Sequence, residues 1–181
     1  MSTTVKDPKI SLKQPEEITK VAEEIGNSAI NEALLKLTPV GQKKDLAALF
    51  QKHNFFCLFK SALAEEVGSV LGDFDSKVTE VYFFEPCMNT DIESGDDLPI
   101  DGTLNLLLVV KTQTAGLDAF IASLDRALTQ TIKELPLPIV ESYDSILNII
   151  PVTQKDIDAR KGYAALLSSL YAPPLKVWQR L

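Results

Sequence analysis

The stretch that decides the fold is Val78–Phe84, VTEVYFF, together with Leu104–Val110, LNLLLVV. The first is short and rich in β-branched and aromatic residues, which predicts a strand. The second is almost wholly aliphatic and is bounded by turn residues, which predicts a strand covered on both faces. The segment 85–102 that joins them is predicted to be a loop, because it contains Pro86, Gly95, Pro99 and Gly102.

Helical spacing precedes this pair of strands. Pro15 opens an apolar stripe that continues to Leu37, and Thr38-Pro39 ends it. A short helical pattern covers residues 46–50, and a third covers about 55–71 with Gly72 as its expected terminator. The sequence therefore predicts three helices before the first strand.

The second half of the chain alternates between the two kinds of pattern. Residues 116–135 have helical spacing, and residues 139–152 are expected to hold one or two strands, the clearest being 146–152. Thr153 and Asp156 resemble a capping box, which predicts a last helix reaching about Tyr171. The stretch from Tyr163 to Trp178 is interpreted either as a surface for a partner or self-association, or as a tail that folds back over its own sheet.

The order of elements predicts an α/β (α+β) fold, a mixed β-sheet with packed helices and extra helices at the N-terminus. We expect a flexible arm over 1–14, an N-terminal helical extension over 15–54 and an α/β domain over 55–181.

Composition narrows the classes of partner and the compartment. The chain of 181 residues has a net charge of -7, which argues against binding to nucleic acids or to anionic membrane surfaces. Two cysteines do not make a disulfide framework, and residues 1–13 lack the apolar core of a signal peptide. These observations predict a cytoplasmic protein.

The strand–acidic loop–strand unit resembles the nucleotidyltransferase superfamily in element order and spacing over about residues 58–160. In that family a strand ends at a Gly-Ser turn, a loop follows, and the next strand opens with Asp-x-Asp. A helix then leads to a strand with a third carboxylate. The three carboxylates hold two metal ions on a nucleoside triphosphate. The resemblance implies a cleft at the ends of these strands.

The positions that match the family's three carboxylates are neutral. Thr103-Leu104-Asn105 stands where Asp-x-Asp would open the second strand, and Asn148 stands where the third carboxylate would lie. Two divalent cations need several anionic oxygens, which Thr and Asn do not supply. Glu85-Pro86 replaces the Gly-Ser turn and puts a negative side chain where a phosphate would approach. The resemblance implies a cleft around Thr103, Asn105 and Asn148 without metal, with three nearby acids, Glu85, Asp97 and Asp101.

Two other groups of side chains have both a chemical and a structural interpretation. The acids of the loop, Asp91, Glu93, Asp96, Asp97 and Asp101, suggest calcium, but no Glu closes an EF-hand loop, and a solvated surface loop is favoured. His53 and Cys57 are four residues apart, the spacing of a Cys–His nucleophile pair on one helical face. The aromatic residues around Cys57 favour a core cysteine instead.

Three functions are consistent with these patterns. The first is a non-catalytic nucleotidyltransferase-like protein that acts by binding a protein partner or a small ligand, without a cofactor. The second is an active nucleotidyltransferase with rearranged carboxylates such as Asp101 and Glu85, using magnesium and a nucleotide. The third is an unrelated α/β interaction or assembly module, which includes a homodimer.

Overall fold

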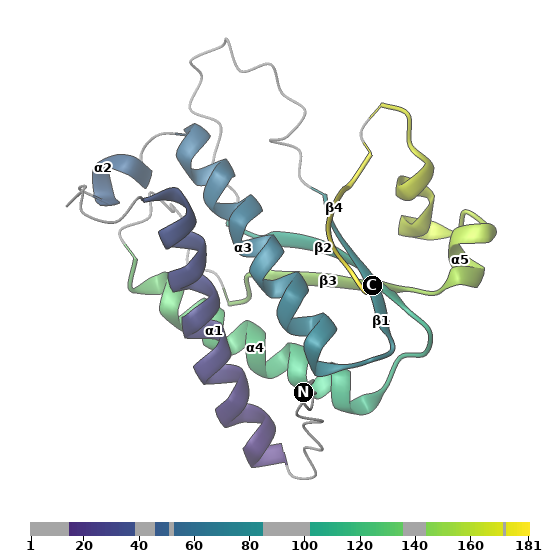
Figure 1. The fold of residues 1–181 in the computed structure, drawn as a ribbon, viewed down its shortest axis with the longest axis horizontal. Helices are drawn as coiled ribbons and strands as arrows, with labels where there is room; N and C mark the ends of the chain where they lie inside the picture. Colours follow the sequence, from purple (N-terminus) through teal and green to yellow (C-terminus); the bar gives the residue numbers. More distant parts are fainter. Residues whose placement is uncertain (1–14, 39–45, 51–52, 85–101, 136–143, 172) are drawn as a thin grey trace, which may run out of the picture.

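The computed structural model describes residues 15–38, 46–50, 53–84, 102–135, 144–171 and 173–181. Helices and strands follow one another in the expected order in the first half of the chain (Figure 1). The elements are α1 (Pro15–Leu37), α2 (Leu46–Phe50), α3 (His53–Phe74), β1 (Val78–Phe83), β2 (Leu104–Val110), α4 (Ala115–Lys133), β3 (Leu147–Val152), α5 (Gln154–Asp158), the 3₁₀ helix η2 (Gly162–Ser168) and β4 (Leu175–Gln179).

The four strands form one mixed sheet in the order β3-β2-β1-β4. β1 is antiparallel to both β2 and β4, whereas β2 and β3 are parallel. A parallel pair needs a long crossover connection, and α4 lies in the connection between β2 and β3. The prediction of an α+β fold, a mixed sheet with packed helices, is confirmed.

β2 is buried on both faces, as its aliphatic sequence predicts. Side chains alternate across a strand, so Leu104, Leu106 and Leu108 face the layer of α1, α3 and α4. Leu107 and Val109 face the other way and pack in a second cluster, where residues of α5 and η2 cover them. The sheet therefore lies between a layer of three long helices, α1, α3 and α4, on one face and the short helices α5 and η2 on the other.

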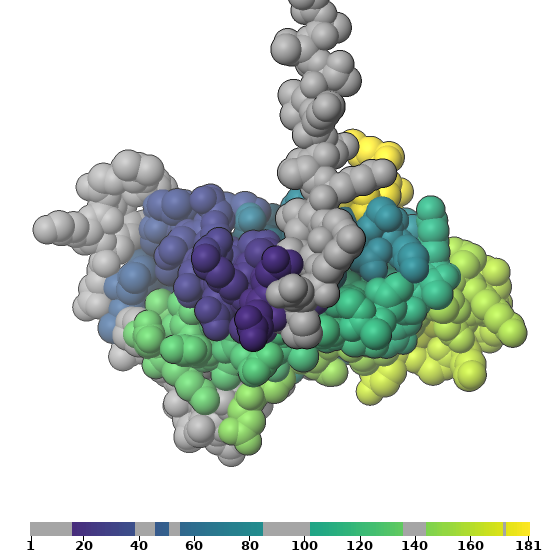
Figure 2. Space-filling model, turned by 90° about the horizontal axis from the view of Figure 1, so that it is seen from below, coloured from purple at the N-terminus to yellow at the C-terminus, as the bar shows by residue number. Residues whose placement is uncertain are grey.

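The N-terminal helix shares the core of the domain. α1 packs against α3 and α4, and Figure 2 shows its purple surface lying on the green surface of α4. Its buried residues Ala22 and Ile30 belong to the same hydrophobic cluster as Leu63 of α3 and Leu124 of α4. Residues before and after position 54 thus form one core.

Gly72 does not end α3, contrary to the sequence prediction. The helix continues to Phe74, and the glycine serves a packing role instead. A Cβ at this position would collide with the ring of Trp178, which lies against the helix from β4. The residue is glycine so that an aromatic ring from the other end of the chain can approach the helix backbone.

The last helix is much shorter than the sequence predicts. The capping box of Thr153 and Asp156 is present, but α5 ends at Asp158 instead of near Tyr171. Arg160 and Gly162 both have positive φ angles, of 50° and 55°, which a right-handed α-helix does not accept. The chain then continues as η2.

The C-terminal tail folds back onto its own sheet, which is one of the two interpretations of the sequence. It pairs with β1 as the edge strand β4, so it extends the sheet instead of covering a face. Arg180 follows the strand and its guanidinium donates hydrogen bonds to the carbonyl oxygens of Val78, Gly72 and Asp75. These bonds join the end of the chain to β1 and to the end of α3.

Candidate functional site

The parallel pairing of β2 and β3 brings Asn105 and Asn148 together. The two residues are direct partners in the register of the strands. The side-chain Nδ2 of Asn148 donates a hydrogen bond of 2.8 Å to Oδ1 of Asn105. Asn105 is half-buried and Asn148 is exposed, so the pair is accessible from solvent. The structure thus brings these two candidate residues into contact.

Thr103 lies at the same end of the sheet. It precedes β2 by one residue and is half-buried. Because side chains alternate along an extended chain, positions 103 and 105 project to the same side. That side is also the one on which Leu107 packs against η2.

The acidic candidates Glu85, Asp97 and Asp101 lie outside the described residues. The other acids of the loop, on which the calcium hypothesis depends, lie outside them too. Cys57 is half-buried in the first turns of α3, and the helix begins at His53, whose side chain is outside the described set. The structure therefore adds no support for a Cys–His pair.

Asp125 of α4 fixes the start of β3, and the sequence alone did not reveal it. Its Oδ1 accepts hydrogen bonds from the backbone N–H groups of Ile146, at 3.0 Å, and Leu147, at 2.8 Å. An acid on an amphipathic helix is ordinarily read as solvated, so nothing in the pattern indicates this role. Asp125 positions the strand that carries Asn148.

Two aromatic residues lie beside the asparagine pair. The backbone N–H of Phe84 donates a 3.0 Å hydrogen bond to the carbonyl oxygen of Asn105. The Phe84 ring lies near the ring of Tyr163 in η2, with centroids 6.0 Å apart and planes tilted by 39°. Across three neighbouring strands the surface thus contains Asn148, Asn105 and Phe84, with Tyr163 next to the last.

A charged network further along this face has a structural role. The hydroxyl of Tyr82 donates to Glu80 at 2.6 Å, and the ammonium of Lys176 on β4 contacts the other carboxylate oxygen of Glu80 at 2.9 Å. Burial alone would raise the pKa of Glu80, but these two hydrogen bonds outweigh it and lower the pKa. Burial and the bond to Glu80 raise the pKa of Tyr82. None of the three groups is prepared to exchange a proton near neutral pH.

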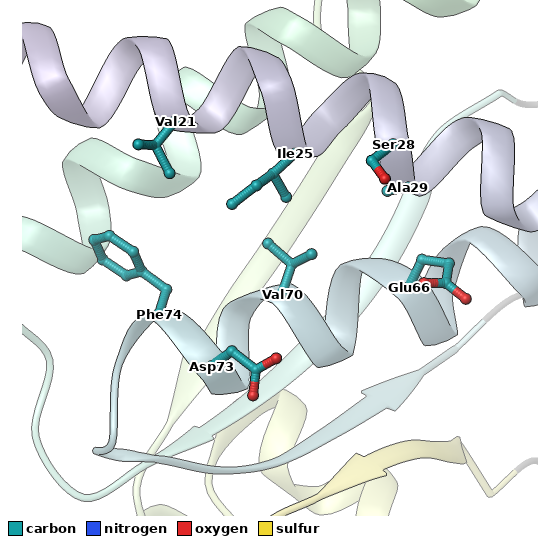
Figure 3. Close-up of a pocket in the computed structure, with 8 residues that line it drawn as sticks. All are labelled: Val21, Ile25, Ser28, Ala29, Glu66, Val70, Asp73 and Phe74. Atoms are coloured by element: carbon teal, nitrogen blue, oxygen red, sulfur yellow. The ribbon is translucent and has the colours of Figure 1, made fainter. Parts of the chain in front are cut away.

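A hollow of about 270 Å³ lies between α1 and α3 in the helical layer (Figure 3), and neither asparagine of the pair lines it. Its lining is mostly apolar, with carboxylates at Glu66 and Asp73. Glu66 is paired with Lys36 at 2.9 Å, and Asp73 is exposed. The lining residues are Val21, Ile25, Ser28, Ala29, Glu66, Val70, Asp73 and Phe74.

Neither a metal centre nor a membrane span is found in the part of the chain that the structure describes. No three His, Cys, Asp or Glu side chains there come together in a way that would hold a metal ion. No helix there has the length and apolar character needed to cross a membrane.

Comparisons with known proteins add no family. A scan against protein-family models, a search of curated proteins and a search of solved structures each found no match.

Proposed function

We propose that this chain is a nucleotidyltransferase-like domain that has lost its metal site and acts by binding. The observation that carries the proposal is the contact between Asn105 and Asn148 on adjacent parallel strands. These are two of the three positions at which the resemblance implies carboxylates. The order helix, strand, strand, helix, strand from α3 to β3 agrees with the family's order.

The chemistry of the pair opposes metal catalysis. Asn105 and Asn148 supply neutral amide oxygens, whereas two divalent cations need anionic ligands to offset their charge and dehydration. One of these oxygens already accepts a hydrogen bond from the neighbouring amide. The contact between the two amides therefore forms without a cation.

The same proposal includes the expected partners. The net charge of -7 opposes contact with a phosphate backbone, so we expect the protein not to bind nucleic acids. A cytoplasmic location and a homodimer remain predictions from the sequence.

Thermal unfolding with nucleotide tests the proposal. A ligand that binds the native state stabilises it, by about 2.7 kcal/mol of unfolding free energy at a concentration 100 times its Kd. The melting temperature rises as a result. We expect ATP with Mg²⁺ or Mn²⁺ to leave the melting temperature of the wild-type protein unchanged, and we expect no release of pyrophosphate.

The active alternative predicts the opposite result. A metal-dependent rise in the melting temperature with ATP, abolished by Asp101→Ala, would show that rearranged carboxylates bind the metal and would overturn the proposal. Gln130→Ala, at an exposed position of α4, is the matched control and should not change the response.

A further inference from the structure

The asparagine pair retains unused hydrogen-bonding groups. A side-chain amide has two N–H donors and an oxygen with two lone pairs. The contact between Asn148 and Asn105 uses one N–H of Asn148 and one lone pair of Asn105. Within the described residues, neither side chain makes another hydrogen bond. Among the described residues, the N–H groups of Asn105 and the oxygen of Asn148 therefore have no partner and can bond to a ligand.

An aromatic flank continues the surface beside the pair. Phe84 is bonded to Asn105 through its backbone and is half-buried, and its ring contacts that of Tyr163. Tyr163 is 54% exposed, so part of its ring faces solvent. Stacking between aromatic groups stabilises a complex beyond the effect of the area that is buried.

The four side chains that form this surface include no Asp, Glu, Lys, Arg or His. Asn148, Asn105 and Phe84 have no ionisable group, and Tyr163 presents a phenol, in a chain that is acidic as a whole. A phosphate or carboxylate would lose hydration there without gaining a cationic partner. A neutral planar group that has both a donor and an acceptor would keep its hydrogen bonds and stack on the aromatic flank.

We infer that this surface binds neutral planar compounds with an amide edge, namely cyclic amides and aromatic carboxamides. The amide edge pairs with Asn105 and Asn148, and the ring lies against Phe84 and Tyr163. The inference depends on the proposed function, because a bound metal would occupy the same oxygens. Binding of these compounds differs from metal-dependent nucleotide binding, because it needs neither a triphosphate nor a cation.

Titrations monitored by NMR test the inference with three small probes. Uracil and nicotinamide carry the amide edge, and nicotinate is the matched anion of nicotinamide. We expect uracil and nicotinamide to shift the side-chain amide signals of Asn105 and Asn148 with a Kd near 1 mM, which corresponds to about -4 kcal/mol. Nicotinate should bind at least about tenfold more weakly, because its carboxylate loses the donor and is desolvated without a partner.

Variants identify the surface. Asn148→Leu and Tyr163→Ala should each weaken nicotinamide binding by about three- to tenfold, the usual value of one hydrogen bond or one ring contact. Tyr171→Ala is the matched control, because Tyr171 is 97% exposed, and it should leave the Kd unchanged. The amide spectrum of each variant shows whether it is folded.

Three outcomes would overturn the inference: no shift with either neutral probe up to about 20 mM, above the range set by a one-millimolar Kd; equal binding of nicotinate; or binding that survives both Asn148→Leu and Tyr163→Ala. The proposed function fails separately, through a metal-dependent effect of ATP on the wild-type protein. If no probe binds and nucleotide has no effect, the inferred ligand class is rejected, whereas the proposed loss of the metal site is not.

Discussion

At the scale of single residues, Asp125 and Gly72 each position a strand that lies far away in the sequence. The carboxylate of Asp125 in α4 accepts hydrogen bonds from Ile146, just before β3, and from Leu147, its first residue, and so positions the strand on which Asn148 meets Asn105. Gly72 leaves room for Trp178, and so lets β4 lie against α3. Neither residue is part of the candidate site, but each determines the geometry of an element.

Gly72→Ala should destabilise the protein by about 1–3 kcal/mol, because the new methyl group overpacks against the indole of Trp178. The measurement is urea unfolding followed by the fluorescence of Trp178, the only tryptophan. Gly116→Ala is the control in α4, where a Cβ meets nothing within 4 Å. It should be neutral or stabilise the helix by up to about 1 kcal/mol. Equal effects of the two variants would contradict the packing role of Gly72.

At the scale of elements, the sequence predicted strands and helices that have strong internal patterns. β2 and α4 are examples, since an aliphatic run and a 3.6-residue period are local properties. β4 was not predicted as a strand, because its five residues follow two prolines and are stabilised by pairing with β1. The end of α5 was missed for a similar reason, since Ala and Leu after Gly162 fit an α-helix as well as η2.

The candidate site, too, was only partly predictable from the sequence. The meeting of Asn105 and Asn148 was predictable because two parallel strands joined by a helix place their starts at one edge of the sheet. The contribution of Tyr163 was not, because it depends on how η2 folds over the second face. Only the assembled sheet shows that an aromatic pair lies next to the amides.

The pairing of β4 with β1 should depend on pH through Glu80 and Lys176. The folded-state pKa of Glu80 is lowered, so its contribution is present at neutral pH and is lost as the pH falls through that lowered value. The hydrogen bond to Glu80 raises the pKa of Lys176, so its contribution is lost only when the pH rises above the usual lysine range. We therefore expect Lys176→Met to destabilise the protein at pH 7 and to have no effect in strong acid.

Urea unfolding across an acid series measures this difference between the wild-type protein and Lys176→Met. Lys133→Met, at an exposed lysine of α4, is the control and should give a difference that does not change through the acid range. A Lys176→Met effect that stays constant from neutral to acid pH would show that the ion pair with Glu80 does not hold the edge strand.

At the scale of the whole molecule, α1 is part of the domain and not an appendage. Its buried residues lie in one cluster with those of α3, β1, β2 and α4. A shared core of this kind unfolds cooperatively in a chain of this size. A change in α1 should therefore be detected at β4, at the other end of the sequence.

Ile30→Ala should lower the free energy of unfolding by about 2–5 kcal/mol, because Ile30 is almost completely buried. Leu35→Ala in the same helix is the control, since Leu35 is 53% exposed, and it should cost about 0.5 kcal/mol or less. Circular dichroism reports the helices and Trp178 fluorescence reports β4. Both probes should shift together for Ile30→Ala, and separate transitions would indicate that α1 forms its own unit.

We propose that neutral residues at Thr103, Asn105 and Asn148 stand where related proteins have a metal site. Titration of Mn²⁺ monitored by electron paramagnetic resonance counts bound ions and tests the claim directly. The wild-type protein should bind no Mn²⁺ at this site. The triple variant Thr103→Asp/Asn105→Asp/Asn148→Asp should bind Mn²⁺ there, because adjacent carboxylates repel each other until a cation neutralises them.

The control for the added charge is Gln113→Asp/Gln130→Asp/Gln154→Asp, three exposed positions apart from the asparagine pair. If the triple variant at the strand ends gains Mn²⁺ binding and this control does not, the account is supported. If the wild-type protein already binds Mn²⁺ with the affinity of the triple variant, or if the triple variant is folded and gains no more Mn²⁺ than the control, the account is contradicted.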